Sequence, residues 1–194
     1  MENVYGEHYG RLIALQEELQ SKIALMDQEL ERENDSRLID HVMVRLKSEE
    51  SVLEKCAKRG LTPTPDVIVT NIHDIVGIRI VSTFLDDTLK VIDAVRRLPS
   101  ITIVEEKDYI SNAKPNGYRS YHMIVRNEEG YLAEIQIRTI SMDTWAALEH
   151  DIKYKKDIKA NKELITSELK RCADELASTD ISMQTIRNMI NGQI

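Results

Sequence analysis

The spacing of hydrophobic residues predicts long amphipathic helices at both ends of the chain. Over residues 8–33 apolar side chains recur at steps of three and four, which places them on one helical face. A similar pattern covers residues 161–191. A second N-terminal helix is predicted over 36–59, compatible with a break near 45–48, and Gly60 is a typical C-terminal stop for it. The apolar stripe of the first helix contains Leu12, Leu15, Leu19, Ile23 and Met26.

The middle of the chain has the patterns of strands and shorter helices. Strands are predicted at 77–83, 101–109, 118–126 and 131–139, the last two joined as a hairpin. Helices are predicted over 86–98 and from an N-cap at Ser141 to about Tyr154. Residues 62–65, Thr-Pro-Thr-Pro, predict an extended loop. The order predicts an α+β fold, a mixed sheet covered by helices with helical N- and C-terminal extensions.

Composition supports one globular domain over residues 1–194. Hydrophobic residues make up 42% and charged residues 30% of the chain, enough for a core. No apolar run approaches the roughly 20 residues that span a bilayer, and the polar N-terminus is unlike a signal peptide. Cys56 and Cys172 lack metal-ligand spacing and are expected to be buried, reduced thiols. These features predict a cytoplasmic protein with no membrane partner.

Net charge narrows the choice of partners. At −7 it argues against a surface that coats nucleic acids generally. A local anion site remains compatible with it, so the clustering of cations matters more than their number. Lys47, Ser51, Lys55 and Arg59 are each four residues apart, which on a helix forms one stripe suited to a polyphosphate. A solvated helix face explains the same spacing.

The segment IHDIVGIRI, residues 72–80, places an acid before a strand. Asp74 could bind Mg²⁺, which prefers carboxylate and phosphate oxygens, although for this residue alone a turn or cap aspartate is the preferred interpretation. The His73-Asp74 pair also suggests a metal-dependent HD phosphohydrolase. His8 and His41 do not complete a ligand set for that chemistry, so the hydrolase is rejected.

The segment AKPNGYRSYH, residues 113–122, joins a turn to a strand. Alternation places Tyr118, Ser120 and His122 on one face. Tyr118 near Lys114 suits a purine stacked on the ring with its phosphate near the cation. Ordinary cross-strand packing of tyrosines is the competing explanation.

The strand predicted over residues 131–139 adds an acid to the same region. Glu134, Gln136 and Arg138 share one face, while Ala133, Ile135 and Ile137 share the other. A solvated outer strand face explains this alternation equally well. Because the hairpin makes this strand a neighbour of Tyr118 and His122, the polar faces are expected to converge. Glu134 could then act as general base and metal partner.

Together, the segments HDIVGIRIVSTF, KDYISNAKPNGYRSYHMIV and LAEIQIRTISMDTWAALEHDIKYK closely resemble the synthetase domain of the RelA/SpoT family. The resemblance covers about residues 40–155, and GYRSYH and EIQIRT are its most specific parts. The short chain and helical flanks, 8–33 and 161–191, resemble the stand-alone small alarmone synthetases. It implies a nucleotidyltransferase-like fold and a homotetramer.

The resemblance implies transfer of pyrophosphate from ATP to the 3′-hydroxyl of GDP or GTP, with Mg²⁺ as cofactor. Asp74 and Glu134 match the metal-binding and catalytic acids. The matching acceptor residues are Lys107, Lys114, Tyr118, His122 and Gln136. The matching ATP residues are Arg45 and Arg79 for the adenine, and Lys47, Ser51, Lys55 and Arg59 for the phosphates.

Departures from the family and rival functions complete the expectations. Regulated members bind a second pppGpp through basic residues of the first helix and an aromatic residue. Here Ala24, Leu25 and Met26 follow Lys22, His41 replaces the aromatic residue, and Asp143 stands where Asn is common. Product activation is therefore expected to be weak or absent. The alternatives are a toxic relative that pyrophosphorylates the tRNA 3′ end and an inactive module that binds nucleotides or single-stranded RNA.

Overall fold

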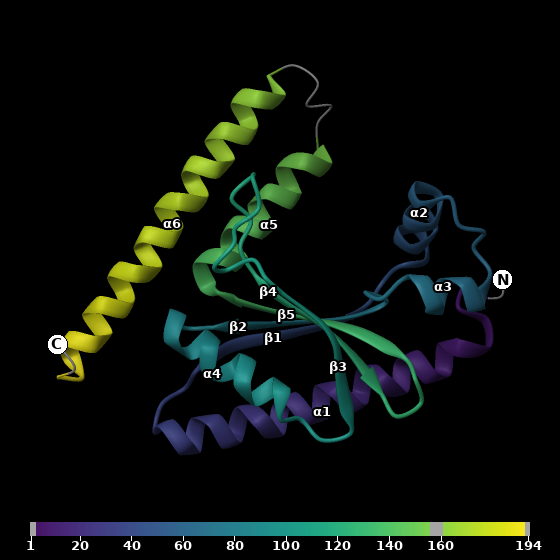
Figure 1. Ribbon diagram of the computed structural model, residues 1–194, viewed down its shortest axis with the longest axis horizontal. Helices are drawn as coiled ribbons and strands as arrows, with labels where there is room; N and C mark the ends of the chain where they lie inside the picture. Colours follow the sequence, from purple (N-terminus) through teal and green to yellow (C-terminus); the bar gives the residue numbers. More distant parts are fainter. Residues whose placement is uncertain (1–2, 156–160, 193–194) are drawn as a thin grey trace.

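A computed structural model describes residues 3–155 and 161–192 as a five-stranded mixed sheet with helices packed around it (Figure 1). The strand order is β1-β2-β5-β4-β3. β2 and β5 are parallel and all other neighbours are antiparallel. The strands are β1 (Ile39–Leu46), β2 (Val76–Ser82), β3 (Ile101–Asp108), β4 (Tyr121–Asn127) and β5 (Leu132–Thr139). The predicted α+β class is confirmed.

Helices α1 (Tyr9–Asn34) and α4 (Leu85–Arg96) cover one face of this sheet (Figure 1). The predicted stripe of α1 is buried, and it packs with the alternate apolar residues of the central strands. Removing this apolar surface from water stabilises the fold by about 25 cal/mol for each Å² buried. On the face of the sheet that points away from α1 and α4, β2 and β5 carry the polar residues of the candidate site.

The N-terminal half departs most from the predictions. The helix predicted over 36–59 is wrong in its first part, because residues 39–46 form β1, which pairs with β2 along its length. Helix α2 (Glu49–Arg59) begins after the cap Ser48 and ends at Gly60, as predicted. The loop predicted at 62–65 ends in a short helix, α3 (Pro65–Asn71), with Thr64 as N-cap and proline in the first turn.

The C-terminal half ends in an antiparallel pair of helices, α5 (Ile140–Lys155) and α6 (Lys162–Ile190) (Figure 1). The N-cap predicted at Ser141 is wrong, because β5 runs directly into α5 and Thr139 Oγ1 accepts from the Met142 amide at 3.2 Å. Cys56 is buried as expected, but Cys172 lies exposed on α6. Among the described residues, no helix is long and apolar enough to cross a membrane.

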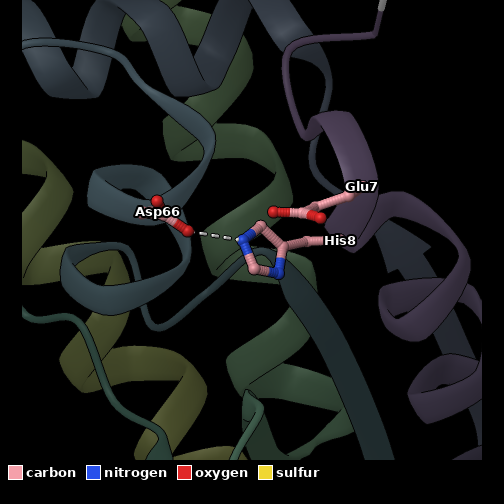
Figure 2. A group of neighbouring side chains, drawn as sticks. All are labelled: Glu7, His8 and Asp66. Carbon is pink, nitrogen blue, oxygen red and sulfur yellow. Dashed lines mark hydrogen bonds and ion pairs between the residues drawn. The ribbon is translucent and has the colours of Figure 1, made fainter.

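The N-terminal turn η1 (Gly6–His8) is tied to the rest of the fold by one histidine. His8 Nε2 lies 2.9 Å from Asp66 Oδ1 on α3, and its Nδ1 lies 2.7 Å from the Tyr131 hydroxyl beside β5. Figure 2 shows the imidazole between Asp66 and Glu7. Both ring nitrogens therefore have partners within the protein, and the cluster fastens the turn to α3 and the hairpin.

Candidate active site

Two rows of residues cross the open face of the sheet. One row, read across all five strands by pairing, is Met43, Arg79, Gln136, His122 and Lys107. The register is fixed by burial of the alternate residues against α1 and α4, since a shift of one residue would expose them.

The adjacent row contains the proposed catalytic acid. Arg45 of β1 pairs with Gly77 of β2, which pairs with Glu134 of β5. The sheet therefore brings together residues from segments far apart in the sequence.

Asp74 lies just before β2 and accepts hydrogen bonds from two lysines. Lys55 Nζ lies 2.7 Å from Oδ1 and Lys47 Nζ lies 3.0 Å from Oδ2. Burial is the largest influence on this carboxyl and opposes its ionisation. The hydrogen bonds and charges of Lys55 and Lys47 together outweigh it, so the pKa of Asp74 is lowered. The carboxylate is thus held in the charged form that a hard cation requires.

The predicted four-residue stripe does not form as one helical face. Lys47 lies in the loop between β1 and α2, and it reaches Asp74 from there. Ser51 is exposed in the first turn of α2, where its hydroxyl lies 2.8 Å from that of Ser48. Arg59 donates to the carbonyl of Asn71 at 2.7 Å. The structure therefore joins the two lysines to the site and directs the other two side chains elsewhere.

Tyr5 fixes the position of the loop that contains Lys47. Its side chain is buried and its hydroxyl donates to the Lys47 carbonyl, while the Lys47 amide donates to Ile75 at 2.7 Å. Burial, with the nearby charges of Glu49 and Asp74, raises the pKa of Tyr5 to about 12. The N-terminal segment thus positions a lysine of the site, which the sequence analysis did not foresee.

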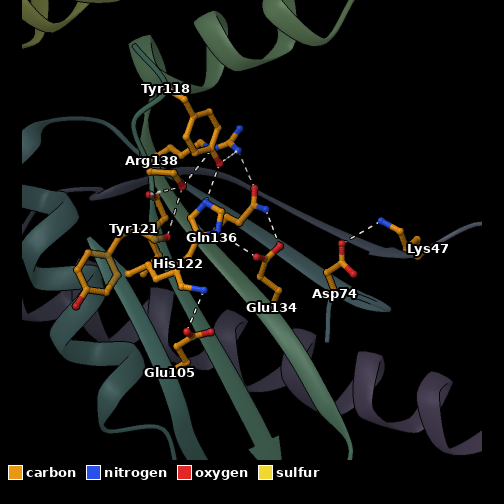
Figure 3. Close-up of polar contacts among 12 residues, drawn as sticks. Lys47, Asp74, Glu105, Tyr118, Tyr121, His122, Glu134, Gln136 and Arg138 are labelled. Atoms are coloured by element: carbon orange, nitrogen blue, oxygen red, sulfur yellow. Dashed lines mark hydrogen bonds and ion pairs between the residues drawn. The ribbon is translucent and has the colours of Figure 1, made fainter. Parts of the chain in front are cut away.

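Glu134 is largely buried and receives one hydrogen bond on each oxygen. His122 Nδ1 lies 3.0 Å from Oε1, and Gln136 Nε2 donates to Oε2 at 2.7 Å (Figure 3). Burial is again the largest single influence, and by itself it would raise the pKa of Glu134. The His122 and Gln136 contacts outweigh it and lower the pKa, even though the charge of Asp74 opposes them.

Two cavities meet at Glu134. The first, about 180 Å³, is lined by residues that include Arg45, Asp74, Arg79, Glu134 and Gln136. The second, about 210 Å³, is lined by Glu105, Lys107, Tyr109, Lys114, His122, Ile124 and Glu134. Asp74 and Glu134 therefore both line the first cavity, and Glu134 also lines the second. Glu134 lies on the wall between them. Such a wall is where two bound reactants could meet.

The first cavity contains an unpartnered buried donor. Arg79 Nε is buried without a hydrogen-bond partner, while its NH1 lies 3.1 Å from Asp143. Asp143 also accepts from Arg138 NH1 at 3.0 Å. A buried donor without a partner costs free energy. A ligand with nitrogen or oxygen acceptors and an aromatic face fits beside this guanidinium.

The second cavity has a cation placed over two aromatic rings. Lys114 Nζ lies 4.4 Å from the ring centre of Tyr109 and 4.7 Å from that of Tyr118. Tyr118 precedes β4, which begins only at Tyr121, so the strand predicted from 118 starts three residues late. Its ring is held by edge contacts with Tyr109, His122 and Trp145 instead.

The loop that carries Tyr118 is packed on the C-terminal helices. Asn116 donates to Glu149 of α5 at 3.1 Å, and Arg119 pairs with Asp174 of α6 at 3.2 Å. Gly117 lies so close to Ala173 that a Cβ there would come within 2.5 Å of it. The position of the Tyr118 ring therefore depends on the packing of its loop against α5 and α6.

Comparison with known proteins adds a family. A family model described as "Region found in RelA / SpoT proteins" matches residues 44–159. The chain belongs to the RelA/SpoT family. The match covers every candidate site residue from Arg45 to Gln136. This RelA/SpoT protein is 38% identical to the GTP pyrophosphokinase YwaC of Bacillus subtilis, over 89% of this chain and 85% of that protein.

Solved structures agree with that assignment. The B. subtilis small alarmone synthetase 1 bound to its product pppGpp superposes with a TM-score of 0.80 at 32% identity, covering 92% of this chain and 94% of the other. The same enzyme bound to AMPCPP gives 0.72 at 29% identity, covering 93% and 94%. The resemblance to the small alarmone synthetases expected from the sequence is confirmed.

Several residues of the site were not assigned by the sequence analysis. Arg138 was placed on the polar face of its strand but given no role, and Asp143 was noted only as a departure. Tyr5 lies in no motif, and Tyr109 lies in a matching segment without a role of its own, because their contribution depends on contacts between distant segments.

Proposed function

We propose that this chain is a (p)ppGpp synthetase, a GTP/GDP pyrophosphokinase that transfers pyrophosphate from ATP to the 3′-hydroxyl of GDP or GTP. The observation that carries the proposal is the position of Glu134 on the wall between two cavities. One cavity is lined by Asp74 and Arg79, and the other by Lys114 and Tyr109. An acid between a donor and an acceptor nucleotide is where proton removal from the acceptor is needed.

In the proposed reaction, the 3′-oxygen of the acceptor attacks the β-phosphorus of ATP. The bond from that phosphorus to the α–β bridging oxygen breaks, so AMP leaves. Glu134 accepts the proton of the 3′-hydroxyl. Lys47 and Lys55, freed from Asp74 by the incoming phosphates, neutralise charge on the transferred group. In phosphoryl transfer such positioning and electrostatic stabilisation supply most of the acceleration.

The donor and acceptor cavities have chemistry suited to different bases. Arg45 and Arg79 flank the first cavity from neighbouring strands, and planar guanidinium groups stack well on adenine. Beside the second, Tyr118 contacts Lys114 and His122 and supplies a ring for guanine. Lys114 and Lys107 on the cavity wall supply cations for the acceptor phosphates. The structure of a relative with pppGpp and with AMPCPP supports the assignment of nucleotides to this site.

Mg²⁺ is the proposed cofactor, held by Asp74 and Glu134. Both are carboxylates with lowered pKa that border one cavity, which fits the oxygen ligands that this ion prefers. When bound, the ion would supply positive charge to the phosphates. Ser51 and Arg59 remain candidates for phosphate contacts only if the α2 region rearranges on binding.

The test is nucleotide chromatography after incubation with ATP, Mg²⁺ and GDP, GTP or GMP in turn. Product and AMP should form in equal amounts. Asp74→Ala and Glu134→Ala should abolish product while the circular dichroism spectrum stays native. Glu106→Ala is the matched control, since this acid lies on β3 outside both cavities. Near wild-type turnover by either site variant would refute the assignment.

The tRNA-modifying alternative predicts transfer of the γ-labelled pyrophosphate to tRNA rather than to a free nucleotide. The same assay with tRNA as acceptor separates the two, and the net charge of −7 favours the nucleotide. An inactive binding module would form neither product.

A homotetramer is the proposed assembly, supported by apolar side chains left exposed on the C-terminal helices. Light scattering after gel filtration should give about four times 22.3 kDa, and a monomeric mass would contradict it. The exposed residues include Leu148, Ile152, Ile181, Ile186 and Met189.

A further inference from the structure

Arg138 is a buried cation in β5 whose donors are almost all committed. Its residue is 3% exposed. NH1 donates to Asp143 at 3.0 Å and Nε to Ser120 at 3.3 Å. NH2 donates to the Tyr118 hydroxyl at 2.7 Å and to Gln136 Oε1 at 2.8 Å. Both hydrogens of NH2 are therefore directed into the site.

The bond from Arg138 NH2 to the Tyr118 hydroxyl orients a chain of hydrogen-bond donors. Arginine has no acceptor, so the Tyr118 oxygen must accept, and its own hydrogen is free to point to His122 Nε2 at 2.7 Å. In a neutral imidazole one nitrogen accepts and the other donates. Nε2 is then the acceptor, Nδ1 carries the hydrogen, and Nδ1 donates to Glu134 Oε1 at 3.0 Å.

The second bond orients an amide. Because Gln136 Oε1 accepts from Arg138, the amide nitrogen is turned to Glu134 Oε2, 2.7 Å away. The two branches start at one guanidinium and end on the two oxygens of one carboxylate. Figure 3 shows the resulting closed ring of Arg138, Tyr118, His122, Glu134 and Gln136.

We propose that Arg138 is a positioning residue that sets His122 as the Nδ1–H tautomer and Gln136 in one amide orientation, so that each Glu134 oxygen receives a donor. Asp143 keeps the guanidinium in place, and through Arg79 links the ring to the first cavity. The kinetic part of this inference rests on the proposed function, in which Glu134 activates the acceptor. The inference about the His122 tautomer does not rest on the proposed function.

The alternative is that Arg138 only stabilises the fold. The two differ in whether the His122 tautomer responds when Arg138 is replaced, and cutting the link between them tests the route of that response. Tyr118→Phe keeps the ring that would stack on guanine and removes only the hydroxyl between Arg138 and His122. Glu134 still accepts from Nδ1 in this variant, so under the proposal the Nδ1–H preference of neutral His122 is weakened and an Nε2–H fraction appears. A purely structural arginine instead predicts that Arg138→Met leaves the tautomer as in the wild type.

The experiment is ¹⁵N spectroscopy of histidine-labelled protein without nucleotides, at a pH where imidazoles are neutral. The His122 signals are assigned by their loss in His122→Gln. Wild-type protein should show His122 as Nδ1–H, and Tyr118→Phe and Arg138→Met should show a tautomer mixture. Arg138→Lys, which can still donate to both branches, should restore part of the preference.

The matched control is Arg96→Met, which breaks another Arg–Tyr–Glu chain outside both cavities. Arg96 NH2 donates to the Tyr121 hydroxyl at 2.9 Å, and that hydroxyl donates to Glu106. This variant should leave the His122 signals and the turnover unchanged. A change as large as that in Tyr118→Phe would overturn the proposal.

Kinetics separate positioning from binding. Tyr118→Phe is expected to lower kcat about tenfold, and Arg138→Met about 10–100-fold, as is typical when the partners that orient a site residue are removed. KM for the acceptor should change less than twofold in Tyr118→Phe. Wild-type His122 found as Nε2–H, or a folded Arg138→Met with unaltered tautomer, would overturn the proposal.

The outcomes also distinguish this inference from the proposed function. If Glu134→Ala kept its turnover while the tautomer results held, the function of Glu134 would be wrong and the positioning chain right. If Arg138→Met did not fold, Tyr118→Phe and Arg138→Lys would still test the proposal. Tyr118→Phe removes one oxygen atom and no charge, and an unaltered His122 tautomer in it would overturn the proposal.

Discussion

The substitution Gly117→Ala tests how strongly the loop that carries Tyr118 depends on packing against α6. The φ of Gly117 is +92°, and an added Cβ would lie 2.5 Å from the Ala173 Cβ and 3.2 Å from the Lys170 Cα. A left-handed backbone costs a residue with a side chain about 1–2 kcal/mol, and overpacking costs about 1–3 kcal/mol. Gly117→Ala is expected to lower the free energy of unfolding by about 2–5 kcal/mol.

Two variants separate these costs. Gly130 has a φ of +94° with nothing within 4 Å of an added Cβ, so Gly130→Ala should lose only the backbone part, about 1–2 kcal/mol. Adding Ala173→Gly to Gly117→Ala removes the methyl group that collides and should recover much of the steric part. Urea unfolding measures all three, together with KM for GDP, which should rise in Gly117→Ala because Tyr118 is the next residue.

The outcome that would refute this reasoning is specific. If Gly117→Ala and Gly130→Ala lost the same free energy of unfolding, the loop would not be packed against α6 in solution. An unchanged KM for GDP in a clearly destabilised Gly117→Ala would separate loop packing from acceptor binding.

Further predictions concern the two bases and the response to acid. Arg79→Met should raise KM for ATP roughly tenfold, equal to about 1.4 kcal/mol of stacking, with KM for GDP unchanged. Tyr118→Ala should weaken GDP binding by about 1–3 kcal/mol, and unchanged affinity by calorimetry would place the guanine elsewhere. The hydrogen bond from Arg96 lowers the pKa of Glu106. This pair therefore stabilises the fold above the unfolded pKa of about 4.3 and loses that effect as pH falls through the lower folded value. Arg96→Met should flatten the fall of Tm below pH 4.3, and an equally steep fall would contradict the pairing.

The sequence predicted strands well where one face is buried on helices. Along β5 the alternation of Ala133, Ile135 and Ile137 with polar residues placed Glu134 and Gln136 together, as the structure has them. Period two is decisive there because the apolar residues are fully buried.

The same reasoning failed at the edge of the sheet. Leu38, Val42 and Leu46 are four apart and fit a helix, while Val42, Val44 and Leu46 fit a strand. Only the pairing of β1 with β2 decides between them, and that contact is remote in sequence. Helix α3 was missed although it had a local signal, a threonine cap followed by proline. Its seven residues are too few for a hydrophobic period to appear.

Individual side-chain partners lay beyond the sequence for a different reason. The resemblance supplied Asp74 and Glu134, but not which lysines or amides would face them, because those partners come from loops whose paths depend on packing. The ring around Glu134 required the register of β4 and β5 and the placement of the loop before β4 at once.

The distribution of charge explains how an acidic chain can offer a site to polyanions. Two lysines share one carboxylate, Asp74, and two arginines share another, Asp143. At these two contacts four cations meet two carboxylates, although the whole chain carries −7. Partly buried charges act strongly over such short distances, while the exposed acids elsewhere are screened within about 8–10 Å. The carboxylates also keep the cations ordered before any nucleotide arrives. In the proposed reaction, a phosphate that displaces Asp74 from its lysines would therefore meet side chains already positioned, and would release a carboxylate to bind a cation.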